Sequence, residues 1–264
     1  MLTDGAAIQI DGSFVLVACS STLYLHIVPL ENGFNPELLL KLQEKYRQDG
    51  KMLVHLWEDV WSINQVGVLS RIRSFLGLNR TYHARKAKIE AIDIQQASSF
   101  FNLYHLQGFV KAKYYYGLTI EGELMGLASF SDLRPMPSRG PDYNSAELVR
   151  FASKDGVTVT GGLSRLIKHF LVLKKPHDLM TYADRDWSFG KGYQRLGFEF
   201  TAETAPAYLY VQKITGRRYF PHRLPKNILL GFDQQKELNL EAYLAERDFA
   251  KVFNTGNLKY HLYL

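Results

Sequence analysis

Cysteine is nearly absent from this sequence, since Cys19 is the only one among 264 residues. A single cysteine excludes an intramolecular disulfide framework and a cysteine-based zinc cluster. Long apolar stretches are absent too, because no run reaches the roughly 18 residues of a spanning helix, and no membrane partner is expected. The opening residues lack a basic segment followed by an apolar one, so we expect no signal peptide and a cytoplasmic location.

Several signatures of known chemistry are also missing. The sequence shows no internal repeat and no low-complexity segment. It lacks the H-E-x-x-H spacing of a helical zinc site and the G-x-S-x-G of a serine nucleophile. The residue pattern therefore predicts no metal ligands, and it leaves both a metal requirement and the oligomeric state open.

What is present fits an ordinary globular protein with a basic surface. Hydrophobic residues make up 46% and charged residues 22%, enough to bury a core. The formal net charge of +6 permits nucleic-acid binding without requiring it. Segment 80–88 holds four lysines or arginines and one histidine, and segment 213–226 holds five lysines or arginines; neither contains an acid, and both contain aromatic residues. Cations that neutralise phosphates beside rings that stack on bases are typical of nucleic-acid contacts.

These basic segments and the separate Lys113 supply the predicted DNA contacts, although a solvated surface would have the same composition. The predicted contacts are Arg80, Arg85, Lys86, Lys113, Arg217, Arg218 and Arg223.

A composition break near 77–80 divides the chain. Before it, apolar and β-branched runs predict strands, and helical periodicity predicts helices. The expected strands are 14–19, 22–28 and 52–57, and the expected helices are 36–47 and 63–76. Segment 1–79 is therefore expected to form a small α/β unit.

After the break, strands and helices alternate irregularly, which favours an α+β domain, α/β-like in part, around one mixed sheet flanked by helices. The expected strands are 88–94, 114–121, 124–130, 146–152, 179–183, 198–202 and 207–212. The expected helices are 95–104, 163–173 and 189–196. We expect this domain to span 80–215, and a basic extension, 216–264, to follow with a helix near 240–249 and a terminal strand.

The turn 157–162 is a candidate phosphate site. Gly161 and Gly162 stand where a turn after a strand opens a helix, and amides at a helix N-terminus suit a phosphate or pyrophosphate. Thr160 and Ser164 can add hydroxyl donors. A plain tight turn would use the same glycines.

Other polar residues are candidates for catalysis. Asp184 follows a buried strand and could act as a general base or cap the next helix. Tyr193 could donate a proton or be a core aromatic, and His105 could be a base or bond to a backbone carbonyl. Glu147 and Arg150 are three apart on one strand and are expected on opposite faces, where Arg150 needs a buried partner or an anionic ligand.

Together the motifs resemble a known family. The run from 105 to 198 reads H-L-Q-G, E-L-V-R-F, V-x-G-G-L-S-x-L-x-K, Y-A-D-R-x-W-S and Y-x-x-L-G-F. It resembles a phage and mobile-element domain of the GNAT fold, similar to the Mom-type proteins that modify adenine in DNA. The resemblance covers about 80–215 and implies a GNAT-type mixed central sheet with acetyl-CoA as cofactor.

The resemblance also implies roles. Acetyl-CoA would bind through Thr158, Thr160, Gly161, Gly162, Ser164 and Arg165, with Ser164 standing where the GNAT pattern has a second glycine. Tyr193 would protonate the departing thiolate. Asp184 or His105 would deprotonate the amine, and Arg150 would hold a phosphate or Asp184.

The first 78 residues resemble part of a patch-repair or homing-endonuclease-like nuclease domain through M-L-V-H-L-W-E-D-V-W. The carboxylates near its strands are Asp11 and the pair Glu58 and Asp59, which could equally form a surface turn. They do not make the metal-binding set of such nucleases, so we expect a truncated half that is structural or contacts DNA.

The sequence therefore predicts an acyl-CoA-dependent transferase that acts on DNA in a phage or mobile-element context. The alternative is a non-catalytic DNA-binding module of a mobile element with a decayed nuclease half. A surviving nuclease is a third hypothesis, which the missing metal ligands disfavour.

Overall fold

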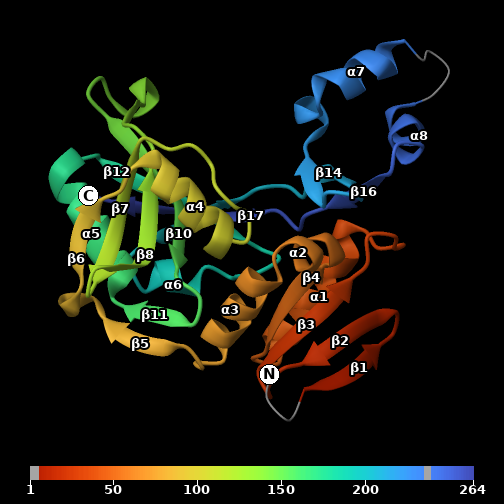
Figure 1. The fold of residues 1–264 in the computed structure, drawn as a ribbon, viewed down its shortest axis with the longest axis horizontal. Coiled ribbons are helices and arrows are strands. Elements are labelled where there is room, and N and C mark those ends of the chain that lie inside the picture. The colour runs from red at the N-terminus through yellow and green to blue at the C-terminus, as the bar shows by residue number, and fades with distance from the viewer. Residues whose placement is uncertain (1–5, 235–238) are drawn as a thin grey trace. The chain divides into compact units, whose positions relative to one another are not determined.

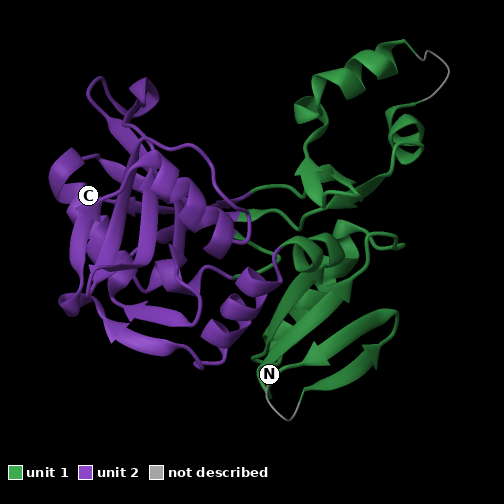
Figure 2. Ribbon diagram, in the orientation of Figure 1, with its two compact units in different colours: residues 1–63, 184–188, 204–257 green, residues 64–183, 189–203, 258–264 purple. Residues whose placement is uncertain are grey.

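The computed structural model describes residues 6–234 and 239–264 (Figure 1). The chain divides into two compact units, coloured separately in Figure 2. Unit 1 comprises 1–63, 184–188 and 204–257, and unit 2 comprises 64–183, 189–203 and 258–264. Both units are discontinuous in sequence, unlike the three consecutive segments 1–79, 80–215 and 216–264 expected above.

Unit 1 begins with a four-stranded sheet of order β1-β2-β3-β4. Its strands are Ala7–Asp11, Phe14–Ala18, Leu23–Val28 and Met52–Trp57. β3 and β4 run parallel, joined by helix α1, Pro36–Gln48. Asn35 caps α1 by accepting the Leu38 amide hydrogen, and Pro36 fills its first turn. The predicted small α/β arrangement of these elements is confirmed.

A second sheet of unit 1 comes from the C-terminal part of the chain. Its order is β15-β14-β16, with strands Arg217–Tyr219, Tyr208–Gln212 and Phe249–Phe253. Helices α2, Glu58–Ile63, α7, Lys226–Asp233, α8, Leu240–Ala245, and the 3-10 turn Pro221–Arg223 complete the unit. The helix expected over 240–249 stops at Ala245, and strand β16 begins at Phe249.

Two histidines lie in the core of unit 1. His26 on β3 and His55 on β4 are both fully buried, and their Nδ1 atoms are 3.0 Å apart. Nε2 of His55 lies 3.2 Å from the Leu39 carbonyl oxygen and donates to it, so His55 accepts the Nδ1–H of His26. Nε2 of His26 is buried without a hydrogen-bond partner. Burial lowers the pKa of His26 to about 4 and that of His55 to about 3.

Unit 2 is built on a mixed sheet whose main path is β13-β17-β12-β10-β8-β7-β6. These strands are Glu199–Glu203, Asn257–Tyr263, Asp178–Asp184, Asn144–Ser153, Glu123–Phe130, Tyr114–Ile120 and Lys88–Ala91. The short β9, Arg134–Pro135, pairs with β10. β5, Arg80–His83, and β11, Val157–Thr160, form a separate parallel pair.

Two helices cover opposite faces of this sheet. α4, Ile94–Tyr104, packs Phe100 and Phe101 against Leu127 of β8, whereas α5, Gly162–Lys174, packs Phe170 against Phe130 of the same strand. The remaining helical elements are α3, Gln65–Phe75, α6, Lys191–Gln194, and 3-10 turns at Ala84–Lys86 and Pro137–Arg139. The predicted α+β class, a mixed sheet flanked by helices, is confirmed.

Further boundaries differ from the sequence-based expectation, and the helix expected over 189–196 is limited to Lys191–Gln194. The helix expected over 63–76 is two helices, because the Asn64 side chain accepts the Gly67 amide hydrogen and caps α3. The strand expected over 88–94 ends at Ala91, since Asp93 caps α4. The turn expected over 157–162 contains β11. No helix in the described part of the chain is both long and apolar enough to cross a membrane.

Candidate active site

The parallel strands β10 and β12 of unit 2 are paired over only a short part of their length. They pair only from Ser145, Ala146 and Glu147 to Asp178, Leu179 and Met180, while β10 stays paired with β8 as far as Ser153. Past the ladder, the Thr181 hydroxyl donates to the Leu148 carbonyl at 2.9 Å. The backbone ladder between β10 and β12 therefore ends at Glu147, and we call the stretch beyond it, where the two strands do not pair, the gap.

A β-bulge after Leu148 changes the face of the sheet toward which the following side chains of β10 point. Its register against β8 shifts between Leu148 and Arg150. Leu148 and Phe151 consequently pack in the same core cluster although they are three residues apart. Glu147 and Arg150 thus share the other face, so the expectation that they point to opposite faces was wrong.

A pocket of about 150 Å³ lies over the paired ends of β10 and β12. Strands β10, β12 and β17 form its floor, and the loop that contains β9 and the turn Pro137–Arg139 forms a wall. Its lining residues are Ser131, Arg134, Met136, Arg139, Ser145, Ala146, Glu147, Asp178, Met180, Tyr182, Lys259 and His261.

Glu147 is the reactive group that this pocket offers. Its carboxylate is half-buried and makes no hydrogen bond or ion pair with the described residues. Burial raises the pKa of Glu147, and the charges of Arg134, Arg150 and Lys259 oppose that rise. The pKa of Tyr182 is raised by the burial of its own hydroxyl and by the negative charge of Glu147. A carboxylate without a partner in a pocket can accept a proton from a bound molecule.

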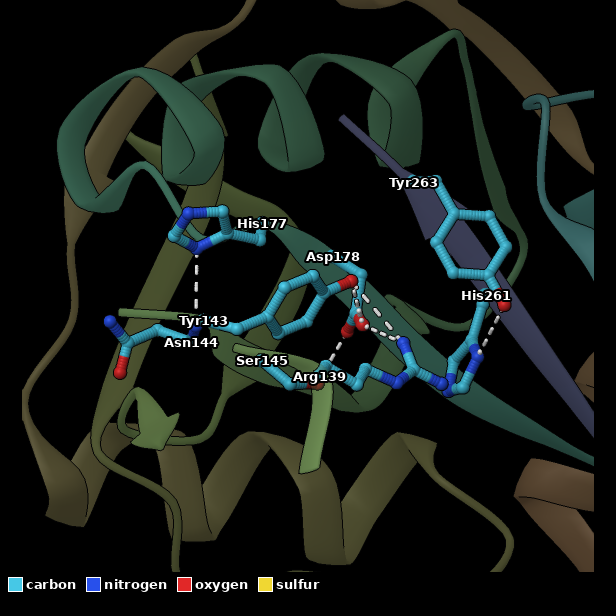
Figure 3. Close-up of polar contacts among 8 residues, drawn as sticks. All are labelled: Arg139, Tyr143, Asn144, Ser145, His177, Asp178, His261 and Tyr263. Atoms are coloured by element: carbon cyan, nitrogen blue, oxygen red, sulfur yellow. Dashed lines mark hydrogen bonds and ion pairs between the residues drawn. The ribbon is translucent and has the colours of Figure 1, made fainter. Parts of the chain in front are cut away.

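Asp178 joins the loop that forms the pocket wall to the sheet through hydrogen bonds (Figure 3). Its buried carboxylate accepts hydrogen bonds from Arg139 at 2.7 Å, from the Tyr143 hydroxyl at 2.8 Å and from the Ser145 hydroxyl. The Arg139 guanidinium also lies over the rings of Tyr143 and Tyr263. One carboxylate thus holds both the loop and β10.

We expect Asp178→Ala to lower the free energy of unfolding by about 2–3 kcal/mol, because it leaves a buried hydroxyl and a partly buried guanidinium without their acceptor. Urea denaturation would measure the loss. Asp142→Ala removes an exposed carboxylate of the same loop and should cost close to nothing. A loss below about 1 kcal/mol for Asp178→Ala would contradict this role.

The candidate phosphate turn lies at the start of α5. Gly161 has φ of 75° and precedes the helix, and a Cβ on Gly162 would lie 2.8 Å from Leu118 Cδ1, so local geometry requires both glycines. Arg165 donates to the carbonyls of Ala84 and Ala87. This contact keeps the turn Ala84–Lys86 beside the start of α5.

The hydroxyls of this segment differ in their contacts. Thr158 accepts a hydrogen bond from Asn79 at 3.4 Å, whereas the Thr160 and Ser164 hydroxyls make none within the described part of the chain. The first amides of α5 have no partner within the helix, as at any helix start. Arg165 is already engaged by two carbonyls, and the acetyl-CoA roles predicted for this segment stay predictions.

His105, Arg150 and Tyr193 belong to unit 2. His105 ends α4, and its Nδ1 accepts the Gln107 amide hydrogen at 3.2 Å, so the proton of the neutral ring is on Nε2. Burial, then Arg150 and Arg71, lowers the pKa of His105 to about 3. The Tyr193 ring packs against Phe198 in the core. His105 is thus neutral and its basic nitrogen already has a donor.

Asp184 is assigned to unit 1, whereas the other three residues are assigned to unit 2. Its carboxylate accepts the Asp186 amide hydrogen at 3.0 Å within the turn 185–187. The helix that follows, α6, begins after Gly190 without a side-chain cap, so the alternative that Asp184 caps the next helix was wrong. Burial first, and then the charge of Asp184, raises the pKa of Asp186 to about 7. The catalytic roles predicted for Asp184, Tyr193, His105 and Arg150 stay predictions.

The predicted DNA contacts are mostly exposed, with one exception. Arg218 forms a two-pronged ion pair with the buried carboxylate of Asp59, at 2.6 and 2.8 Å. Asp59 starts helix α2 and is 2% exposed, so the suggestion that it lies on a surface turn was wrong. The exposed residues are Arg80, Arg85, Lys86, Lys113, Arg217 and Arg223.

The carboxylates of the nuclease-like segment are also engaged. Glu58 accepts the Leu30 amide hydrogen, and Asp11 pairs with Lys45. Among the described residues, no three His, Cys, Asp or Glu side chains gather in a way that could hold a metal ion.

Sequence reasoning noticed Glu147 but did not select it, and it missed Arg134, Asp178, Tyr182 and Lys259. An acid within an apolar strand was the available signal for Glu147. The other four are ordinary surface or strand-end residues in sequence, and only the sheet brings them together.

No family model matches the chain, and no curated protein matches it. Several solved acetyltransferases are similar in structure. A GNAT family acetyltransferase from Elizabethkingia anophelis, with acetyl-CoA bound, is 14% identical, with a TM-score of 0.37. A Bacillus subtilis acetyltransferase in complex with CoA is 15% identical, with a TM-score of 0.35. In both cases the match covers 68% of this chain and 99% of the other.

A third similar structure is Arabidopsis thaliana Naa50 in complex with a bisubstrate analogue, at 10% identity and a TM-score of 0.38, with the same coverage. At these identities and TM-scores, the likeness carries no argument about what this chain binds or does.

Proposed function

We propose that unit 2 is an acyltransferase that takes an acyl group from acyl-CoA, such as acetyl-CoA, and passes it to an amine in the Glu147 pocket. The observation that carries this proposal is that the pairing of β10 with β12 ends at Glu147, whose carboxylate makes no hydrogen bond or ion pair with the described residues. An open gap between two strands accepts a slender chain, and a pocket beside it accepts a second molecule.

The residues around the gap fit acyl-CoA. Strand edges beyond Glu147 and Met180 present backbone groups that can bond to the amides of a pantetheine chain, as an added strand would. The amides at the start of α5 suit its pyrophosphate. Arg85 and Lys86 are exposed on the turn that Arg165 keeps beside that helix start, where they can contact phosphates.

Bound acetyl-CoA would supply a thioester, which is an acyl group activated toward an amine. Glu147 would remove the proton from the amine nitrogen as that nitrogen bonds to the acyl carbon and the carbon–sulfur bond breaks. The wall loop and Tyr182 would orient the amine and exclude water. Tyr193 stays the sequence-predicted donor of the proton that the leaving sulfur takes up.

For the acceptor we propose a base of DNA, adenine N6 in particular. The exposed cations Arg80 and Lys113 on unit 2, which are separate from the cations proposed for acyl-CoA, can neutralise the phosphates of DNA. An aromatic amine is a weak nucleophile, so proton removal during attack has a large effect on its rate. The Mom-like, mobile-element and endonuclease-like parts of the resemblance stay predictions that support this choice of acceptor.

Ser164→Asp tests the acyl-CoA proposal. A carboxylate in the first turn of α5 favours the helix but repels a pyrophosphate there. We expect acetyl-CoA at about 100 Kd to raise the melting temperature of the wild type by about 5 °C or more, and not that of Ser164→Asp. Ser164→Asn, a neutral control of the same size, should keep the shift. Gly162 is unsuitable, because any side chain there meets Leu118.

The same titration can refute the proposal. No shift of the wild type with acetyl-CoA or CoA up to millimolar concentration would exclude it. A shift of equal size in Ser164→Asp and Ser164→Asn would place the phosphates away from α5.

A further inference from the structure

The Glu147 pocket contains two cations and, for both of them, one carboxylate that makes no direct contact with either. Arg134 comes from β9 in the wall loop and Lys259 from β17 in the floor. Neither side chain makes a hydrogen bond or an ion pair with any residue that the structure describes. Their charges do reach Glu147, whose pKa they lower against the effect of burial.

Among the other ionisable groups of the pocket, Arg139, Asp178 and His261 contribute no net charge. Arg139 is paired with Asp178 at 2.7 Å. Burial lowers the pKa of His261, so that ring is neutral at neutral pH. Two positive charges then face the single carboxylate of Glu147. The pocket carries an excess of positive charge even when Glu147 is ionised.

Cations that line a cavity attract an anion more strongly than the same cations on an open surface. Met136 and Met180 are also part of this lining, and they reduce the water that would otherwise screen the charges. Arginine presents paired donors to phosphate or carboxylate oxygens, and lysine adds a compact charge.

We propose that Arg134 and Lys259 form an anion subsite beside Glu147, so that the preferred acceptor carries a phosphate or carboxylate close to its amine. This inference rests on the proposed function for the role of the amine, but the anion subsite itself does not. An anion seated there would also offset the cations that lower the pKa of Glu147. Glu147 would then become a stronger base when the acceptor binds.

Matched pairs of ligands test the subsite by isothermal titration calorimetry. One pair is 2′-deoxyadenosine 5′-monophosphate and 2′-deoxyadenosine, and a second set is O-phosphoethanolamine, β-alanine and ethanolamine. We expect the anionic member of at least one set to bind about tenfold or more tightly than its neutral partner. Within the second set, the affinity of O-phosphoethanolamine compared with that of β-alanine separates phosphate from carboxylate recognition.

Variants of the two pocket cations show whether the preference for anionic ligands arises at this subsite. Arg134→Gln and Lys259→Gln should each reduce the preference, whereas Lys191→Gln, which removes an exposed lysine of α6 outside the pocket, should leave it intact. Equal binding of anionic and neutral ligands in every set would overturn the inference. So would a preference that survives both pocket variants.

A shift in melting temperature with acetyl-CoA, measured on the same samples, separates the two proposals. A shift without an anion preference removes the subsite and leaves the transferase. An anion preference without a shift removes the transferase and leaves the subsite.

Discussion

Glu147→Gln is expected to lower the rate of acetyl transfer about 10²- to 10⁴-fold, the usual contribution of a general base. Glutamine keeps the size of the side chain but cannot accept a proton. The binding of acetyl-CoA should be unchanged, because the proposed phosphate contacts lie at the start of α5. Release of free CoA with a DNA oligonucleotide as acceptor measures the rate, and calorimetry measures the binding.

Glu199→Gln is the matched control, since Glu199 is an exposed glutamate of β13 in the same unit. It should retain the wild-type rate. The wild-type rate should rise with pH through the elevated pKa of Glu147, because only the ionised carboxylate accepts a proton. The residual rate of Glu147→Gln should lack that rise. A variant that keeps more than a third of the wild-type rate would refute Glu147 as the base.

The stability of the wild-type protein is expected to fall steeply below pH 6.5, and the buried pair His26 and His55 contributes to this fall together with His105. The pKa values of His26 and His55 lie below the ordinary value of 6.5, at about 4 and about 3. The unfolded chain therefore binds more protons in this range. The stabilisation is fully present above pH 6.5 and is lost as the pH falls toward 4. For His26 alone it amounts to about 3 kcal/mol.

Urea denaturation at pH 7.0, 5.5 and 4.5 measures this dependence. His26→Asn keeps a donor toward Nδ1 of His55 and removes one titrating group. The free energy of unfolding of His26→Asn should be lower at pH 7 than that of the wild type. Its dependence on pH should be weaker, because unfolding of the variant takes up about one proton fewer. Equal slopes for the two proteins between pH 6 and 4.5 would show that the pair does not control acid unfolding.

Local patterns were sufficient to predict most elements of the fold. Helix α1 has a capping asparagine, a proline in its first turn and helical apolar spacing, all visible in sequence. β3 and β4 are short apolar runs with terminating residues. Elements that depend on distant partners were missed. β5 has a polar, basic sequence and exists because it pairs with β11, and residues 204–257 join the N-terminal segment only through long-range contacts.

The candidate site was predictable only in part for the same reason. Gly161 and Gly162 mark the start of α5 in sequence. The placement of Arg150 on the face of Glu147 was not predictable, because the bulge between Leu148 and Arg150 breaks the alternation that strand periodicity assumes. Arg218 looked like a DNA contact because its buried partner, Asp59, lies far away in sequence.

The most direct test of the central claim is mass spectrometry of DNA incubated with the protein and acetyl-CoA and then digested to nucleosides. The proposed function predicts a nucleoside heavier by one acetyl group with the wild type and with Glu199→Gln, and almost none with Glu147→Gln. Unmodified nucleosides in every sample, together with no binding of acetyl-CoA by calorimetry, would contradict the assignment of unit 2 as an acyltransferase.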